Sequence, residues 1–145
     1  MSVLALDTDV LVNWAHAGAG RHREARRLIE RELAGATSRL ALTASVVLEF
    51  LHVVTDTRRF DMPLSMDEAA EVASEIWNSP DVDRIPAAPR VVPRTLELLR
   101  RHRLGRKRIH DTALAATLES AGVRRLATWN PGDFEVFGFL ELVGG

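Results

Sequence analysis

The sequence has no cysteine and only one lysine, Lys107, in 145 residues. Because cysteine is absent, we exclude disulfides, thiolate metal sites and cysteine nucleophiles. Nothing indicates an oxidising compartment, so the cytoplasm is the expected location. A chain of this length can bury a sizeable core without a covalent or metal crosslink.

Long apolar runs are also missing. No stretch of the sequence approaches the roughly 18–20 consecutive apolar residues of a membrane-spanning helix. The first ten residues, MSVLALDTDV, have no basic residue before their apolar stretch, and Asp7 interrupts that stretch. Such a segment does not have the pattern of a signal peptide. We therefore predict no association with a membrane.

Neither sign of charge predominates, because the formal net charge is −1. This balance argues against a globally basic nucleic-acid binder. The positive charge is nearly all arginine, concentrated in RHREARR from Arg21 and in RRHRLGRKR from Arg100. Two interpretations remain open: these clusters are solvated helix faces, or their guanidinium groups bind phosphates.

Predicted strands and helices alternate along the whole chain. Short apolar runs predict strands at residues 3–6, 39–42 and 81–85, in VRRLAT and in FLELV. Helices are expected at residues 10–15 and 21–33, after the caps Thr43 and Ser65, in TLELLRRHRL, and at residues 111–121. This alternation predicts a single domain over residues 1–145, an α/β/α sandwich with a central, mainly parallel sheet.

Acidic residues recur where the predicted strands end. Asp7 and Asp9 follow the first strand, Asp133 follows the strand of RRLAT, and Asp111 begins a helix of small and apolar residues. Functional groups in parallel sheets gather beyond the carboxyl ends of the strands, so we expect these acids at one edge. Capping of a helix is the simpler interpretation for Asp9, and also accounts for Asp111 alone.

Glu49 lies within the apolar helix sequence VVLEFLHVV. Its helical neighbours Val46 and Val53 lead us to expect a buried carboxylate, which is costly unless a cation or strong donors meet it. Clustered carboxylates would repel one another in the absence of a cation. An oxygen-only donor set selects a hard divalent ion, and we therefore expect Mg²⁺ or Mn²⁺.

Taken together, these segments resemble the PIN-domain ribonucleases, and specifically the VapC-type toxins of toxin–antitoxin systems. The resemblance rests on LALDTDVLV, the glutamate of SVVLEFLHVV, IHDTALAATLESAGVRRLAT and TWNPGDF, and it spans essentially the whole chain. It implies that Asp7, Glu49 and Asp111 bind the metal. The fourth position is divided between Asn130, where many relatives have an aspartate, and Asp133.

The same resemblance implies supporting roles for two hydroxyl residues, Thr8 beside the first acid and Thr128. Asp9 departs from the family pattern, because relatives often have asparagine or serine there. It therefore adds a carboxylate, which either contacts the water around the metal or only caps the helix.

The activity implied by the resemblance is hydrolysis of RNA phosphodiester bonds by a metal-activated water, leaving 5′-phosphate and 3′-hydroxyl ends. The resemblance also implies an antitoxin partner, for which we expect a docking surface near Trp14, Leu28 and Phe50. A homodimer is a further expectation, with the apolar residues of the helix at 71–77 as its candidate contact.

Two alternatives remain at this point. LDTDVL also fits the nucleophile loop of haloacid-dehalogenase-type phosphatases, in which Asp7 would attack the substrate. A catalytically inactive PIN-like binding module is the second alternative. Two assays distinguish the ribonuclease, the phosphatase and the inactive module. The first measures RNA cleavage and its loss on Asp7→Asn or on chelation of the metal. The second measures phosphate release from a phosphatase substrate.

Overall fold

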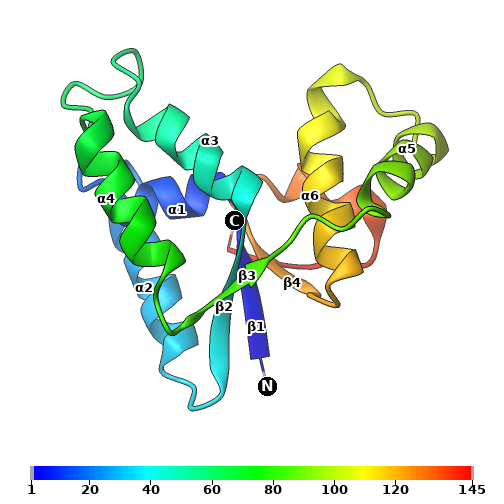
Figure 1. Ribbon diagram of the computed structural model, residues 1–145, viewed down its shortest axis with the longest axis horizontal. Helices are drawn as coiled ribbons and strands as arrows, with labels where there is room; N and C mark the ends of the chain where they lie inside the picture. The colour runs from blue at the N-terminus through cyan, green and yellow to red at the C-terminus, as the bar shows by residue number, and fades with distance from the viewer. Residues whose placement is uncertain (1, 145) are drawn as a thin grey trace.

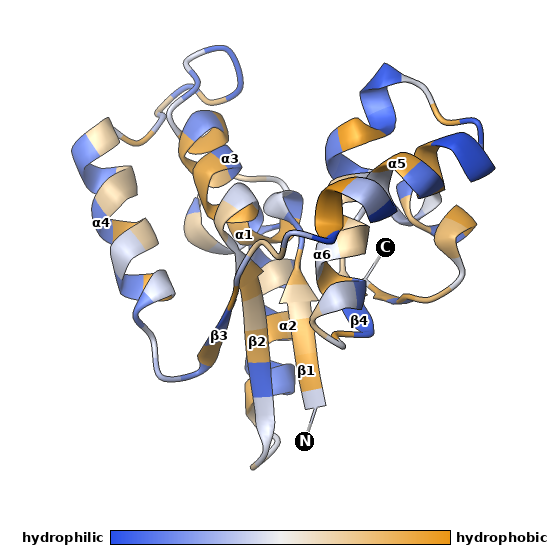
Figure 2. Cartoon of the chain, turned by 45° about the vertical axis from the view of Figure 1, so that its right-hand side comes forward, coloured by the Kyte–Doolittle hydropathy of each residue, from blue (hydrophilic) through white to orange (hydrophobic). Residues whose placement is uncertain are grey.

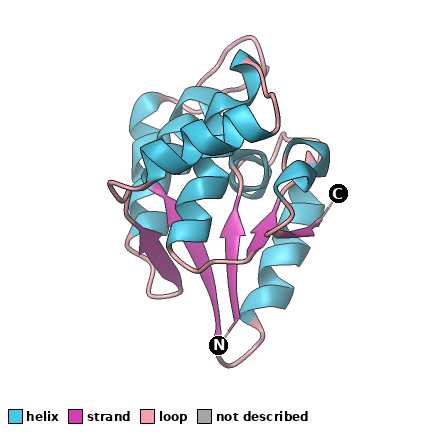
Figure 3. Cartoon of the chain, turned by 90° about the vertical axis from the view of Figure 1, so that its right-hand side faces the viewer, coloured by secondary structure: helices cyan, strands magenta, loops and turns pink. Residues whose placement is uncertain are grey.

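The computed structural model describes residues 2–144. Its centre is a five-stranded, entirely parallel sheet in the order β3–β2–β1–β4–β5. Figure 3 shows the central strands pointing in the same direction. The strands are β1 (Ser2–Leu6), β2 (Ser38–Thr43), β3 (Val82–Ile85), β4 (Arg125–Ala127) and β5 (Glu141–Val143).

Helices cover both sides of this sheet. Helices α1 to α4 lie on one side of it in Figure 1, and α5 and α6 pack together on the other. Their bounds are α1 (Thr8–Ala15), α2 (His22–Leu33), α3 (Ala44–Val54), α4 (Met66–Trp77), α5 (Val91–Arg101) and α6 (Ile109–Ser120). Three short 3₁₀ helices follow the chain at Arg106–Arg108, Pro131–Asp133 and Glu135–Phe137. The predicted α/β/α sandwich with a parallel sheet is confirmed.

The strands are short and apolar because the sheet is covered on both faces. Leu4 and Leu42, in the neighbouring strands β1 and β2, are fully buried, and so is Leu126 in β4. Figure 2 shows the hydrophobic colour along most of β1. Within residues 2–144, no helix is long and apolar enough to cross a membrane.

Two predicted helix caps, Thr43 and Ser65, are confirmed by their hydrogen bonds. Thr43 accepts the backbone N–H of Val46 and so caps α3. Ser65 accepts the backbone N–H of Glu68, while the Glu68 carboxylate accepts that of Ser65, which forms a capping box at α4. Each cap satisfies backbone donors that the first turn would otherwise leave unpaired.

Other boundaries differ from the predictions. Helix α1 begins at Thr8 rather than at residue 10, because Asp7 caps it. Helix α3 ends at Val54 and not within TDTRRF. Helix α5 begins at Val91, four residues before TLELLRRHRL, because Pro93 lies in its first turn, where the missing N–H costs no hydrogen bond.

Candidate active site

The strand order places β1 between β2 and β4, so the connections after β1 leave the sheet at a switch point. The backbone N–H of Asp7 donates to the carbonyl of Ala127, with 2.9 Å between nitrogen and oxygen. The segments that follow β1 and β4 therefore start side by side. This contact brings the acids near residue 7 together with those near residue 130.

Asp7 is held by two donors from different elements. Its Oδ1 accepts the backbone N–H of Thr8 at 2.9 Å, and its Oδ2 accepts the hydroxyl of Thr128 at 2.8 Å. The Thr128 hydroxyl also accepts the backbone N–H of Asn130 at 3.0 Å. Thr128 therefore orients the carboxylate, while the buried side chain of Thr8 lines the cavity beneath it.

Asp9 does not cap the helix, contrary to the simpler interpretation of the sequence, because Asp7 occupies the cap position of α1. Its Oδ2 instead accepts the backbone N–H of Trp129 at 3.1 Å and the side-chain Nδ2 of Asn130 at 2.8 Å. Its Oδ1 is buried and has no hydrogen-bond partner in the described residues. Asp9 therefore joins helix α1 to the segment after β4 and leaves one oxygen without a donor.

Asp111 and Asp133 line the same cavity as Asp7 and Asp9, but they come from elements on the other side of the sheet. Asp111 lies in the first turn of α6, and Asp133 ends the 3₁₀ helix Pro131–Asp133. Arg108 contacts Asp133, since its Nη2 donates to the Asp133 carbonyl and its Nε lies 3.9 Å from the Asp133 Oδ1. A role for Arg108 was not predicted, because nothing in the sequence distinguishes it from the other arginines of RRHRLGRKR.

Glu49 is exposed, so the prediction of a buried carboxylate is wrong. The buried face of α3 is formed by Val46, Phe50 and Val54, four residues apart, and Glu49 lies beside that face. It nevertheless lines the same hollow as the other acids, at its solvent-exposed wall. Its candidate role therefore rests on its place at the cavity and not on burial.

One cavity of about 610 Å³ unites these side chains, and we refer to it as the acid cavity. All eight residues proposed from the sequence contribute to it or to the contacts just described. The cavity is lined by Asp7, Thr8, Asp9, Glu49, Asp111, Asn130 and Asp133, and Thr128 lies behind Asp7. Arg59 and Phe60, from the segment between α3 and α4, also line it and were not predicted.

The electrostatics of the acid cavity oppose full ionisation. Burial, reinforced by the nearby Asp9 carboxylate, raises the pKa of Asp7 to about 7. Burial, followed by repulsion from Asp133 and Glu49, raises the pKa of Asp111 to about 6. Burial also raises the pKa of Asp9, although hydrogen bonds from Trp129 and Asn130 oppose the shift. Carboxylates in this state would be stabilised by a cation.

The donor set fits a hard divalent ion. The cavity presents carboxylate oxygens, including the unpartnered Oδ1 of Asp9, and these are the ligands that Mg²⁺ and Mn²⁺ prefer. Among residues 2–144, no three histidine or acidic side chains converge closely enough to form a complete ligand group.

The predicted docking surface needs a correction. Phe50 is fully buried and Leu28 is 7% exposed, because both side chains pack into the core. Trp14 is half-buried and lines an apolar hollow of about 260 Å³ with Leu11, Leu33, Val72 and Ile76. Of the three predicted residues, Trp14 alone lies at an accessible apolar surface.

Comparison with known proteins agrees with this fold and with the resemblance seen in the sequence. The PIN domain family matches residues 4–139. A Mycobacterium tuberculosis protein named Ribonuclease VapC24 is 29% identical over 137 residues, which cover 94% of this chain and 92% of that protein. The chain therefore belongs to the PIN domain family, and the alternative assignment to the haloacid-dehalogenase phosphatases is wrong.

Solved structures share the fold at lower identity. The Mycobacterium tuberculosis toxin VapC20, described as cleaving the sarcin-ricin loop, superposes with a TM-score of 0.72 at 23% identity, over 97% of this chain and 99% of that one. A DNA-bound VapBC structure from Salmonella typhimurium gives a TM-score of 0.66 at 16% identity, covering 99% and 98% of the two chains. These likenesses confirm the PIN-like architecture.

Proposed function

We propose that this protein is a metal-dependent endoribonuclease and the toxin of a VapBC-type toxin–antitoxin pair. The observation that carries the proposal is the acid cavity at the carboxyl edge of the sheet, which is lined by five acidic residues, Asp7, Asp9, Glu49, Asp111 and Asp133. The family match and the relative named Ribonuclease VapC24 support it. The products would be RNA ends with a 5′-phosphate and a 3′-hydroxyl.

Mg²⁺ or Mn²⁺ would be held by Asp7, Asp111 and Glu49, directly or through water. Such an ion lowers the pKa of a bound water and offsets the charge of an attacked phosphate. Thr128 keeps the Asp7 carboxylate pointing into the cavity, and Thr8 supports it from the first turn of α1. The exposed Arg59 side chain lies at the cavity wall, where a guanidinium can meet a phosphate.

Asp9 and Asn130 are both candidates connected with the fourth acidic position of the site. From the resemblance, we expect an amide or hydroxyl side chain at position 9 and a carboxylate at position 130. In this chain the two side chains contact each other at 2.8 Å with the carboxylate on Asp9. We infer that Asp9 supplies the fourth carboxylate, while Arg108 partly neutralises Asp133.

Activity is tested by incubating purified protein with total bacterial RNA and either Mg²⁺ or Mn²⁺, followed by analysis of the new ends. We expect cleavage that EDTA abolishes and that Asp7→Asn or Asp111→Asn removes. Asp67→Asn is a matched control, because Asp67 is an exposed aspartate in the first turn of α4.

Cleavage that persists in Asp7→Asn and in EDTA would contradict a metal nuclease. Release of phosphate from a monoester substrate, without RNA cleavage, would favour phosphatase chemistry despite the fold. A protein that binds RNA but never cuts it would favour the inactive binding module.

An antitoxin partner is part of the proposal, since toxin–antitoxin complexes from Klebsiella pneumoniae and Rickettsia felis share the fold. We place its contact at the apolar hollow beside Trp14, between α1, α2 and α4. Ile76→Asp should prevent co-purification with the antitoxin and leave RNA cleavage intact. Co-purification that is unchanged would refute this location.

A homodimer remains a prediction. Val72, Ile76 and Trp77 in the segment named for it pack partly against the core, whereas Leu48, Leu96 and Ile109 are more exposed. Light scattering across a concentration series measures the oligomeric state directly. The cytoplasmic location likewise remains a prediction.

A further inference from the structure

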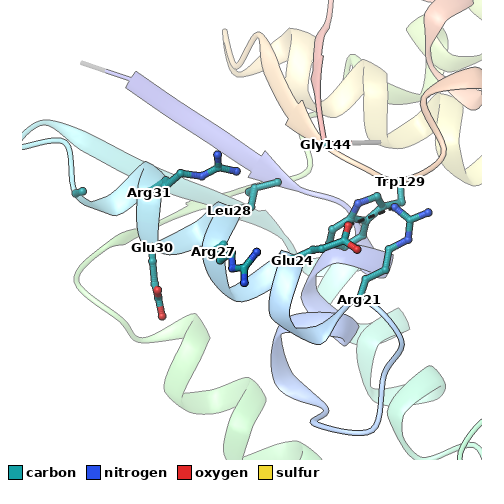
Figure 4. Close-up of a pocket in the computed structure, with 9 residues that line it drawn as sticks. Arg21, Glu24, Arg27, Leu28, Glu30, Arg31, Trp129 and Gly144 are labelled. Carbon is teal, nitrogen blue, oxygen red and sulfur yellow. Dashed lines mark ion pairs between the residues drawn. The ribbon is translucent and has the colours of Figure 1, made fainter.

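A second hollow of about 730 Å³ lies along helix α2, next to the acid cavity. Its cationic side chains are Arg21, Arg27 and Arg31, and its aromatic side chain is Trp129. Figure 4 shows Arg21 beside Trp129, with Arg27 and Arg31 further along the helix. We call this hollow, defined by these four residues, the arginine groove.

The arginine groove shares its supports with the acid cavity. The backbone N–H of Trp129 donates to Asp9, and the next residue, Asn130, lines the acid cavity. The backbone N–H of Arg21 donates to the side-chain oxygen of Asn13 at 2.9 Å, and Asn13 lines that cavity too. A chain leaving the acid cavity on this side would therefore meet Arg21 and Trp129 first.

The pair of Arg21 and Trp129 has the chemistry of a nucleobase platform. The guanidinium carbon of Arg21 lies 5.4 Å from the centre of the indole ring. Its ion pair with Glu24 spans 3.7 Å between side chains that are 49% and 61% exposed, which makes it a weak restraint. Unstacked bases bind on aromatic faces and on guanidinium planes of this kind.

Arg27 and Arg31 supply positive charge beyond the platform. They lie one helical turn apart on α2, both are exposed, and neither forms an ion pair within residues 2–144. Glu24 and Glu30 also line the groove, so the three arginines leave it with net positive charge. Guanidinium groups bind phosphate oxygens through two parallel hydrogen bonds, so both arginines can contact the backbone of a nucleic-acid strand.

We propose that the arginine groove binds single-stranded RNA next to the cleavage site, with a nucleobase on Trp129 and Arg21 and backbone phosphates on Arg27 and Arg31. The inference rests on the proposed ribonuclease function and adds where the substrate strand runs. A single strand is required, because a base in a duplex does not offer its face to a side chain. RNA is favoured over an acidic protein segment because Trp129 and Arg21 each donate a backbone hydrogen bond to a residue that lines the acid cavity.

Binding tests the proposal separately from cleavage. The probe is a fluorescein-labelled, mixed-sequence, single-stranded RNA of twelve nucleotides, titrated in Mg²⁺ against Asp7→Asn protein so that the probe stays intact. Adding Trp129→Leu should raise the Kd at least about fivefold, whereas Trp129→Phe should retain most of the affinity. Thermal melting of each variant confirms that it is folded.

The two arginines are tested together against a control of equal charge. Arg27→Gln with Arg31→Gln should weaken binding and lower the slope of log K against log salt by about 1.4, as expected for two lost phosphate contacts. The control is Arg84→Gln with Arg124→Gln, both exposed arginines outside the groove and outside the two basic clusters. It should leave the slope near that of the parent.

Several results overturn the proposal. They are absence of RNA binding, equal loss in the control, an unchanged Kd in folded Trp129→Leu, or a groove variant that loses only the antitoxin. Cleavage assays then distinguish failure of the proposed function from failure of the proposed groove. If the protein cuts RNA but the groove variants have an unchanged Kd, the ribonuclease function stands and RNA binding in the groove is refuted. If RNA binds in the groove but is never cut, the groove stands and the ribonuclease function is refuted.

Discussion

Replacing Asp7 by asparagine should make the metal-free protein more stable while it removes activity. The charged Asp7 carboxylate is mostly buried and lies near Asp9, and these two features raise its pKa from 3.8 to about 7. A raised carboxylate pKa means that the folded state disfavours the charge that the unfolded chain carries freely. Asparagine has nearly the same shape and carries no charge.

The magnitude follows from the pKa and the hydrogen bonds. A rise from 3.8 to about 7 corresponds to at most about 4 kcal/mol, at about 1.4 kcal/mol per pKa unit. Asparagine would keep the bond from the Thr8 N–H but turn an amide toward the Thr128 hydroxyl, which costs about 1 kcal/mol. Partial exposure reduces the gain further, so we expect about 1–3 kcal/mol and a Tm about 3–10 °C higher.

The dependence on pH has a fixed direction. Below pH 3.8 both the folded and the unfolded forms of Asp7 are neutral, so the variant and the parent should have similar stability. As the pH rises from about 4 to about 7, the unfolded chain ionises first and the parent loses stability relative to the variant. The difference should reach its maximum above pH 7.

Thermal and urea unfolding in EDTA at pH 5, 6, 7 and 8 measure this difference. Asp67→Asn, on the exposed first turn of α4, is the control and should change stability by less than about 0.5 kcal/mol. A lower Tm for Asp7→Asn at pH 8, or a gain of equal size at every pH, would refute the electrostatic reasoning.

Three further predictions concern the same cavity. Mn²⁺ at 100 times its Kd should stabilise the parent by about 2.7 kcal/mol in thermal unfolding, and Asp7→Asn by much less. Thr128→Val should reduce activity about 10–100-fold with little change in RNA affinity, because the Asp7 carboxylate loses its orienting donor. Asp9→Asn should reduce activity, and adding Asn130→Asp should restore part of it; a double variant no better than the single one would refute their exchange.

Much of the fold was predictable because it depends on local patterns. Short apolar runs separated by amphipathic segments specify buried parallel strands, and the caps at Thr43 and Ser65 fix where two helices begin. The start of α1 was misplaced because both Asp7 and Asp9 have the chemistry of a cap. The position of β4 beside β1 shows that Asp9 contacts the segment after β4 and that Asp7 caps the helix.

Glu49 shows the limit of helical periodicity. The pattern around it predicts an apolar helix, and α3 does bury Val46, Phe50 and Val54. Periodicity does not show whether the flank of that face meets another element or an open cavity. Glu49 borders the cavity, so its side chain remains exposed to solvent.

The contacts of Asp9 depend on a register that the sequence does not encode locally. Asp9 and Asn130 are 121 positions apart, and each alone reads as a departure from the family pattern. Parallel pairing of β1 with β4 nevertheless places their side chains in hydrogen-bond contact. The carboxylate of Asp9 and the amide of Asn130 therefore act on the acid cavity as a pair, and the Asp9→Asn, Asn130→Asp variant tests whether the two groups can be exchanged between these positions.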